Sequence, residues 1–227
     1  MDKNILKALL LCPLFEKLTP GEIEEAMSGV NYQLVRYNKK EIYARTGEPT
    51  HLADIVISGE MVGKMENKSG RCVKIITENT GKLIASTFIF SKNRFFPVTI
   101  EAVRPTTLLS MKTDEFLQLI NGDQRIMMNY ISLLSTIGTN LACRIRQLTL
   151  FTVREKVAHF LSEEAKRRNT NTIMLTISRQ ELADNFAIQK YSLQRVLSEF
   201  ARSGAIRLDG KSITILDCEL MMSLASR

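Results

Sequence analysis

Cysteine is scarce in this sequence, and its spacing excludes several kinds of site. The four cysteines, Cys12, Cys72, Cys143 and Cys218, lie 60 or more residues apart. Zinc ribbons, redox Cys-x-x-Cys motifs and iron–sulfur clusters need cysteines that are close together in the sequence. We therefore expect reduced, packed thiols in a cytoplasmic protein, and no metal centre.

Groups for catalysis are also few. His51 and His159 are the only histidines, and no acidic residues cluster in the strand-rich part of the chain. An enzyme would need a convergent nucleophile and base, or paired carboxylates, in a pocket. The sequence therefore argues against an enzyme.

Long apolar runs are missing as well. The first residues place three leucines before Cys12, as a lipoprotein signal does, but Leu11 is too large for cleavage and Lys7 interrupts the apolar run. We expect an amphipathic helix there, and no later stretch approaches the ~20 apolar residues of a membrane span. What the sequence does have is a net charge of +7 and a pI near 9.3, which favour an anionic partner.

Residues 20–115 alternate short β-rich runs with turn residues. Thr19 can cap and Pro20 can open a short helix at the start. Turn signals such as Gly47-Glu48-Pro49 then separate strand-length segments at intervals of ~8–12 residues. This pattern predicts an antiparallel barrel or sandwich.

A helical pattern extends from Asp123 to about Leu150, with a single glycine and no proline. Its apolar residues recur at alternating spacings of three and four, which is typical of a coiled coil. The stripe could lie on the barrel, but a helix of ~40 Å is longer than one small barrel covers. We predict a parallel homodimer whose interface contains Met127, Tyr130, Leu134, Ile137, Leu141 and Leu148.

The last part of the chain predicts a winged helix-turn-helix. A helix at residues 153–168 precedes a short strand and two amphipathic stretches between Ser178 and Gly204. Ser178 and Glu181 have the spacing of a capping box. Asp209-Gly210 is the dipeptide that most favours a two-residue hairpin turn, and alternating apolar residues flank it.

The second helix of the pair predicts a DNA-reading surface. Advancing 100° per residue buries Leu193, Val196, Leu197 and Phe200 and places Tyr191, Arg195, Ser198 and Arg202 on the opposite side. Such a face is often only solvated, and a winged helix can also bind proteins. Combined with a wing and a dimer, however, it predicts binding to an inverted repeat in double-stranded DNA, with the two helices ~34 Å apart.

The region from Phe151 onward, and more loosely the whole chain, resembles the Crp/Fnr family of bacterial transcription regulators. SRQELADNF and QKYSLQRVLSEF are similar to the two helices of its DNA-binding motif. The resemblance implies an α+β chain: a cyclic-nucleotide-binding-like β-barrel (jelly roll) at residues 1–122, a dimerisation helix at 123–150 and a winged helix-turn-helix at 151–227.

The same resemblance implies roles for single residues. Arg179 would clamp a phosphate, Lys190 would contact base or backbone, Arg195 would read a base, and Lys211 would add a phosphate contact from the wing. Tyr191 replaces a glutamate that commonly accepts a hydrogen bond from cytosine, so the usual half-site is not expected. The expected DNA-binding residues are Ser178, Arg179, Gln189, Lys190, Tyr191, Ser192, Arg195 and Lys211.

The expected effector is a small molecule other than cyclic AMP. Nucleotide-binding members of the family hold the ribose with a Gly-Glu pair and the phosphate with an Arg-Ser pair, but Ala85-Ser86 and Phe96-Pro97 stand there in this chain. A buried phosphate without an arginine is costly. The alternatives are that these side chains simply fill the barrel, or that they form an apolar pocket lined by Ile84, Ala85, Ser86, Phe96, Pro97 and Thr99 and closed by Thr139 and Asn140.

A faint resemblance to the subgroup that regulates hybrid-cluster and nitrosative-stress genes leaves haem as an alternative, for sensing nitric oxide or redox state. Met65 would then be an axial ligand, although a lone methionine on a strand is more often a core residue. An iron–sulfur mechanism is disfavoured because Cys12 is alone near the amino end. If the protein activates transcription, RNA polymerase would be a further partner.

Overall fold

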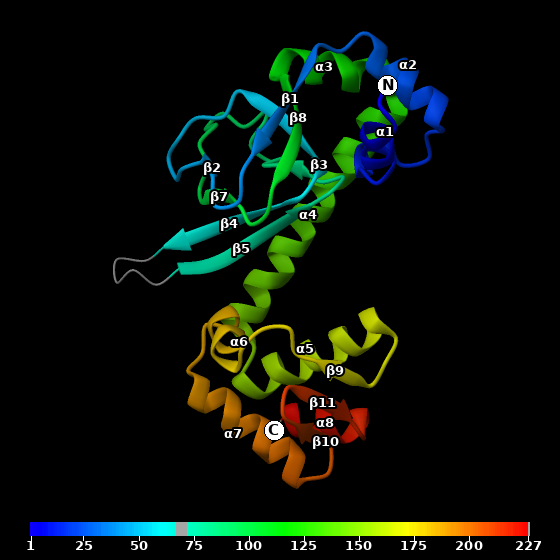
Figure 1. Ribbon diagram of the computed structural model, residues 1–227. Coiled ribbons are helices and arrows are strands. Elements are labelled where there is room, and N and C mark those ends of the chain that lie inside the picture. Colours follow the sequence, from blue (N-terminus) through cyan, green and yellow to red (C-terminus); the bar gives the residue numbers. More distant parts are fainter. Residues whose placement is uncertain (67–71, 227) are drawn as a thin grey trace. The chain divides into compact units, whose positions relative to one another are not determined.

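The computed structural model describes residues 1–66 and 72–226. The chain divides into two compact units, Met1–Gly138 and Thr139–Arg227, whose elements are labelled in Figure 1. The architecture is the predicted α+β combination, with antiparallel sheets in both units. No helix of the described residues is long and apolar enough to span a membrane.

The first unit begins with the two helices that the sequence predicts. Asp2 caps α1 (Lys3–Leu10) by accepting a hydrogen bond from the backbone of Asn4. A 3-10 turn, η1 (Pro13–Phe15), leads to α2 (Pro20–Ser28), and Thr19 and Glu22 form a capping box at its start.

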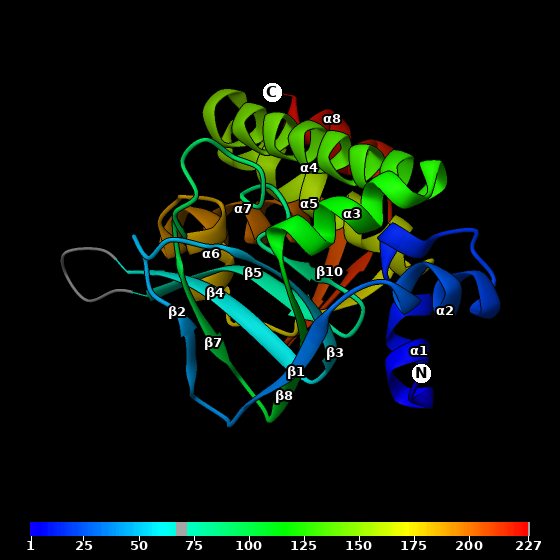
Figure 2. The ribbon, with the colours of Figure 1, turned by 90° about the horizontal axis from the view of Figure 1, so that it is seen from above.

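Two four-stranded antiparallel sheets follow and form the predicted roll (Figure 2). Its interior contains Val56, Met61 and Leu108, all buried. One sheet has the order β1 (Tyr32–Tyr37), β8 (Thr106–Lys112), β3 (Leu52–Ser58) and β6 (Leu83–Ile84). The other has the order β2 (Ile42–Ala44), β7 (Thr99–Ala102), β4 (Glu60–Glu66) and β5 (Cys72–Asn79).

Helices α3 (Thr113–Gly122) and α4 (Gln124–Leu150) complete this part of the chain. The first half of α4 packs Ile126, Tyr130, Leu133 and Leu134 against the core of the first unit. The predicted dimer seam is therefore wrong at Tyr130, which is buried within its own chain. Leu134, also predicted in the seam, is partly buried against the same core.

The second unit has the order expected of a winged helix-turn-helix. Thr152 and Glu155 form a capping box at the start of α5 (Val153–Arg168), and the hairpin wing turns at Asp209-Gly210 as predicted. The wing joins a three-stranded sheet of order β10-β11-β9. The other elements are β9 (Thr172–Met174), α6 (Arg179–Asn185), α7 (Lys190–Arg202), β10 (Ile206–Asp209), β11 (Ser212–Ile215) and α8 (Cys218–Ala225).

Candidate nucleic-acid interface

A tight turn joins α6 to α7. Phe186 ends α6, Ala187 adopts the left-handed conformation with φ of 54°, and Gln189 precedes α7 in an extended conformation. Ile188 packs partly against the core of the second unit, which fixes the turn. At the start of α6, Ser178 accepts a hydrogen bond from the backbone of Glu181, but the return bond of the predicted capping box is not formed among the described residues.

Helix α7 has the two faces that its sequence predicts. Leu193, Val196, Leu197 and Phe200 are buried in the core of the second unit. Tyr191 is 75% exposed on the other side. Lys190, Arg195, Ser198 and Arg202 are exposed as well, whereas Ser192 is half-buried.

The guanidinium of Arg195 is available for a ligand. Arg195 makes no hydrogen bond or ion pair with any residue that the structure describes. Arg202, further along α7, donates from Nε to the carbonyl of Ser198 at 3.4 Å. A planar guanidinium with free donors matches the O6 and N7 acceptors of guanine.

Arg179 connects the first helix of the pair to the wing. Its Nη2 donates to the backbone oxygen of Gly210 at 3.1 Å, so one role of this side chain is to hold the wing turn. Lys211, next to that turn, is exposed.

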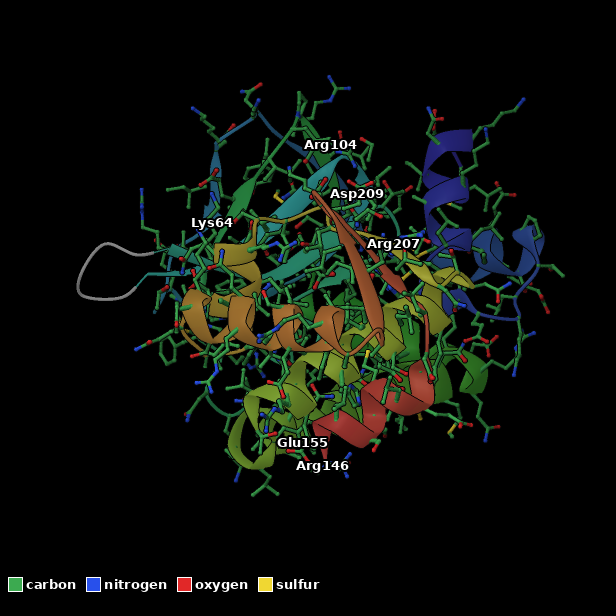
Figure 3. The ribbon with its side chains drawn as sticks, turned by 90° about the horizontal axis from the view of Figure 1, so that it is seen from below. Lys64, Arg104, Arg146, Glu155, Arg207 and Asp209 are labelled. Carbon is green, nitrogen blue, oxygen red and sulfur yellow. The ribbon has the colours of Figure 1, made fainter. Side chains whose placement is uncertain are left out.

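Sequence reasoning missed two charged features near this surface. Arg207 and Asp209 are exposed on β10 (Figure 3), and the alternation of apolar residues around Arg207 was a usable signal. Arg154, on α5, pairs with Glu199 on α7 across 45 residues of sequence, with Nη2 and Oε1 2.9 Å apart. That pair has no local sequence signal, because it depends on how α5 packs against α7.

The end of α4 is fastened to the helix pair within the second unit. Lys156 Nζ donates to the carbonyl oxygens of Leu148 and Phe186, at 3.0 and 3.3 Å. Arg144 Nη2 lies 3.5 Å from the carbonyl oxygen of Asn185. These bonds link the C-terminal part of α4 and the start of α5 to the C-terminal end of α6. A cavity of about 300 Å³ lies beside them.

The residues of the expected effector pocket lie in both units and differ in their exposure. Ile84 and Phe96 are buried in the interior of the roll, and Ala85 packs against them with a left-handed φ of 52°. Ser86 is buried, Thr99 is half-buried beside Thr46, and Pro97 is exposed. Thr139 and Asn140 belong to the second unit, and both are exposed.

Aromatic side chains fill the interior of the roll around Phe96. The ring of Tyr43 meets Phe96 edge to face at 5.6 Å between centroids, and Tyr37 meets Tyr43 at 5.7 Å. The Tyr43 hydroxyl donates to the carboxyl of buried Asp54, whose pKa is raised by desolvation. The packing therefore favours the interpretation that Ile84 and Phe96 are core residues.

The candidate haem ligand Met65 and the two histidines lie in different segments of the chain. Met65 is 49% exposed on β4, His51 is exposed ahead of β3, and His159 lies on α5 in the second unit. Among the described residues, no three histidine, cysteine or acidic side chains gather where they could hold a metal ion.

Comparison with known proteins identifies the motif that this geometry forms. Residues 155–224 match the Crp-like helix-turn-helix domain. The second unit therefore contains a Crp-like helix-turn-helix domain. Crp/Fnr-type regulators, which carry such a domain, bind DNA.

The similar proteins and solved structures cover most of this chain. The cAMP-activated global transcriptional regulator CRP of Pasteurella multocida is 20% identical over 184 residues, which cover 79% of this chain and 88% of that protein. The structure of FixK2 from Bradyrhizobium japonicum is similar with a TM-score of 0.63 and 18% identity, over 87% of this chain and 99% of that one. A CooA variant from Carboxydothermus hydrogenoformans gives a TM-score of 0.67 at 18% identity, over 99% and 97% of the chains.

Proposed function

We propose that this chain is a transcription regulator of the Crp/Fnr type, a homodimer that binds a specific inverted repeat in DNA and is controlled by a small effector other than cyclic AMP. One observation carries the proposal. Arg195 lies, exposed and unpaired among the described residues, on the outer face of the second helix of a Crp-like helix-turn-helix.

The outer face of α7 is proposed to enter the major groove. Arg195 would donate to a guanine, and Lys190 and Tyr191 would meet bases or backbone at the leading end of the helix. Ser178, Gln189, Ser192 and Lys211 would bind phosphates and fix the register. Arg179 would reach a phosphate with the donors that Gly210 does not use.

The dimer is proposed to form along a different face of α4 from the one that the sequence analysis indicates. Met128 and Ile131 are 54% and 46% exposed, and the same alternating spacing continues through Ser135, Gly138, Ala142 and Ile145. At 100° per residue, this stripe lies about 120° around the helix from the side chains that face the core.

The proposed face also suits close helix packing. Beyond its two neighbours and the nearby backbone of α4, an added Cβ on Gly138 would meet no atom of the described residues within 4 Å. Small residues at the middle of the stripe let two helices approach, while Met128 and Ile145 supply apolar area toward its ends. Of the seam predicted from sequence, Leu141 and Leu148 remain exposed and can border this face.

Cyclic AMP is a poor fit for the first unit. Buried Phe96 and exposed Pro97 stand where nucleotide-binding relatives are expected to carry their phosphate ligands. Arg94, the nearest cation, donates from Nε to the carbonyl of Ser91 at 3.3 Å. A phosphate there would lack the charge-assisted bonds that offset its desolvation. Met65 gives haem little support, because about half of its surface is exposed to solvent.

The proposed division of labour assigns residues 1–122 to effector sensing, 123–150 to dimerisation and 151–227 to DNA binding. Helix α4 runs through the middle of this scheme and is continuous from Gln124 to Leu150. Its last turn is bonded to α5 and α6 through Lys156. A change in how two α4 helices meet would therefore reach both DNA-binding motifs.

Binding to random-sequence duplex DNA tests the function. We expect retention at low ionic strength that falls steeply with added salt, because phosphate contacts release counterions. Repeated selection from a random pool should then enrich an inverted repeat. A chain that retains no duplex at any salt concentration would instead be a winged-helix module for protein interactions.

A further inference from the structure

We propose that Arg154 is a positioning residue for DNA recognition, because it holds the carboxylate of Glu199 in a forked ion pair and so keeps Arg195 open to a base. The inference rests on the proposed base contact of Arg195. It adds a residue outside the helix pair to the recognition machinery.

The ion pair joins two helices. Arg154 Nη2 lies 2.9 Å from Oε1 of Glu199, and Nε donates to Oε2 at 3.3 Å. Both carboxylate oxygens are therefore engaged, in the two-pronged geometry that makes arginine–carboxylate pairs strong and directional. Arg154 is in the first turn of α5, and Glu199 is in the last turns of α7.

Glu199 has a second possible partner on its own helix. Arg195 precedes it by four residues, so the two side chains project from neighbouring positions on one face of α7. Both side chains, together with Arg154 and Tyr191, line a shallow hollow of about 360 Å³ between the start of α5 and α7.

The ion pair with Arg154 keeps the carboxylate of Glu199 away from Arg195. While both oxygens of Glu199 are held, Arg195 has no ion pair among the described residues. Without Arg154, the carboxylate would pair with Arg195, and a base would have to displace it before it could bind the guanidinium. Once a base had displaced it, the carboxylate would be an uncompensated negative charge beside the DNA phosphates.

Arg202 is a further cation on α7, three residues after Glu199. Its guanidinium is bonded to the carbonyl of Ser198, and the side chain does not line the hollow. Arg195 is therefore the expected new partner once Arg154 is removed.

The experiment compares four full-length variants, Arg154→Gln, Glu199→Gln, the double variant and Arg195→Ala, with the native protein. The probe is the duplex that the native protein selects from a random-sequence pool. Arg154→Gln should weaken binding about fivefold, the size of one exposed ion pair. Glu199→Gln should stay within about twofold of native, and adding it to Arg154→Gln should restore that level.

The double variant separates positioning from direct contact. If Arg154 bound a phosphate itself, the loss would be the same with or without Glu199, and the salt slope would fall by about one. That result would overturn the inference. If Arg195→Ala left binding unchanged, the proposed base contact would fail instead, so the two failures are distinguishable.

A crystal structure of the Arg154→Gln variant without DNA gives an independent reading. We expect the carboxylate of Glu199 on the guanidinium of Arg195. A carboxylate that stays in solvent or turns to Arg202 overturns the inference, even if no duplex is selected. Unchanged thermal unfolding of the variants shows that the packing of α5 on α7 is intact.

Discussion

The hydroxyl of Tyr130 donates a hydrogen bond of 2.8 Å to the backbone oxygen of Ser86. Tyr130 is on the long helix α4, and its ring also meets that of Phe116 edge to face at 5.2 Å between centroids. Both partners of the bond are buried. This contact fixes the first half of α4 as part of the core of its own unit, and so decides which face of the helix remains for a partner.

The bond itself should be measurable as stability. Tyr130→Phe keeps the ring but leaves the buried carbonyl of Ser86 without its donor, so the free energy of unfolding should fall by about 1–2 kcal/mol. Chemical denaturation measures it. Tyr191→Phe is the matched control, because that hydroxyl is exposed and makes no hydrogen bond among the described residues. Equal effects of the two changes would mean that the Tyr130 bond adds nothing.

The revised dimer face predicts a contrast between neighbouring residues. Ile131→Asp places a charge in the proposed apolar stripe and should shift the protein from dimer to monomer in sedimentation equilibrium. Ser132→Asp places the same charge on the next residue, which is also exposed but lies about 100° further around α4. The second variant should remain dimeric. Dissociation by both variants, or by neither, would argue against this stripe.

DNA recognition predicts a difference between base and phosphate contacts. Arg195→Ala should cost about 1–3 kcal/mol on the selected duplex and much less on random DNA. Lys211→Ala, which removes an exposed cation beside the wing turn, should weaken both duplexes alike and lower the salt slope by about one. Fluorescence anisotropy titrations at several salt concentrations give these quantities. Equal losses for Arg195→Ala on both duplexes would make Arg195 a phosphate contact.

Local rules were sufficient for the DNA-binding motif. The buried face of α7 follows from the 100° advance per residue, and the wing turn follows from Asp209-Gly210. Helix α8 was missed, although Asp217 accepts a hydrogen bond from the backbone of Leu220 at its start and was a readable cap.

Helix α4 shows where such rules stop. It carries apolar residues on two faces: Ile126 and Tyr130 face the core, and Met128 and Ile131 face away. The spacing of apolar residues shows which faces of a helix are apolar. It does not show which surface packs against each face. The same limit applies to the roll. The sequence does not show whether Phe96 lines a pocket or packs in the interior. Its edge-to-face contact with Tyr43 favours the interior.

Stability of the first unit should depend on pH through Glu78. This side chain lies on β5, and burial raises its pKa from 4.5 to about 7, against the opposing effect of Lys82. A carboxyl whose pKa is higher in the folded state than in the unfolded state favours folding while it is protonated. Its contribution is complete below about pH 4.5 and is lost as the pH rises to about 7. Glu78→Gln keeps the shape of the side chain and removes its titration.

The native protein should therefore lose stability relative to the Glu78→Gln variant between pH 4.5 and about pH 7, and the difference should level off above pH 7. Denaturant unfolding of both proteins across that range measures the difference, and a difference that does not change with pH would show that Glu78 is solvated in the folded protein.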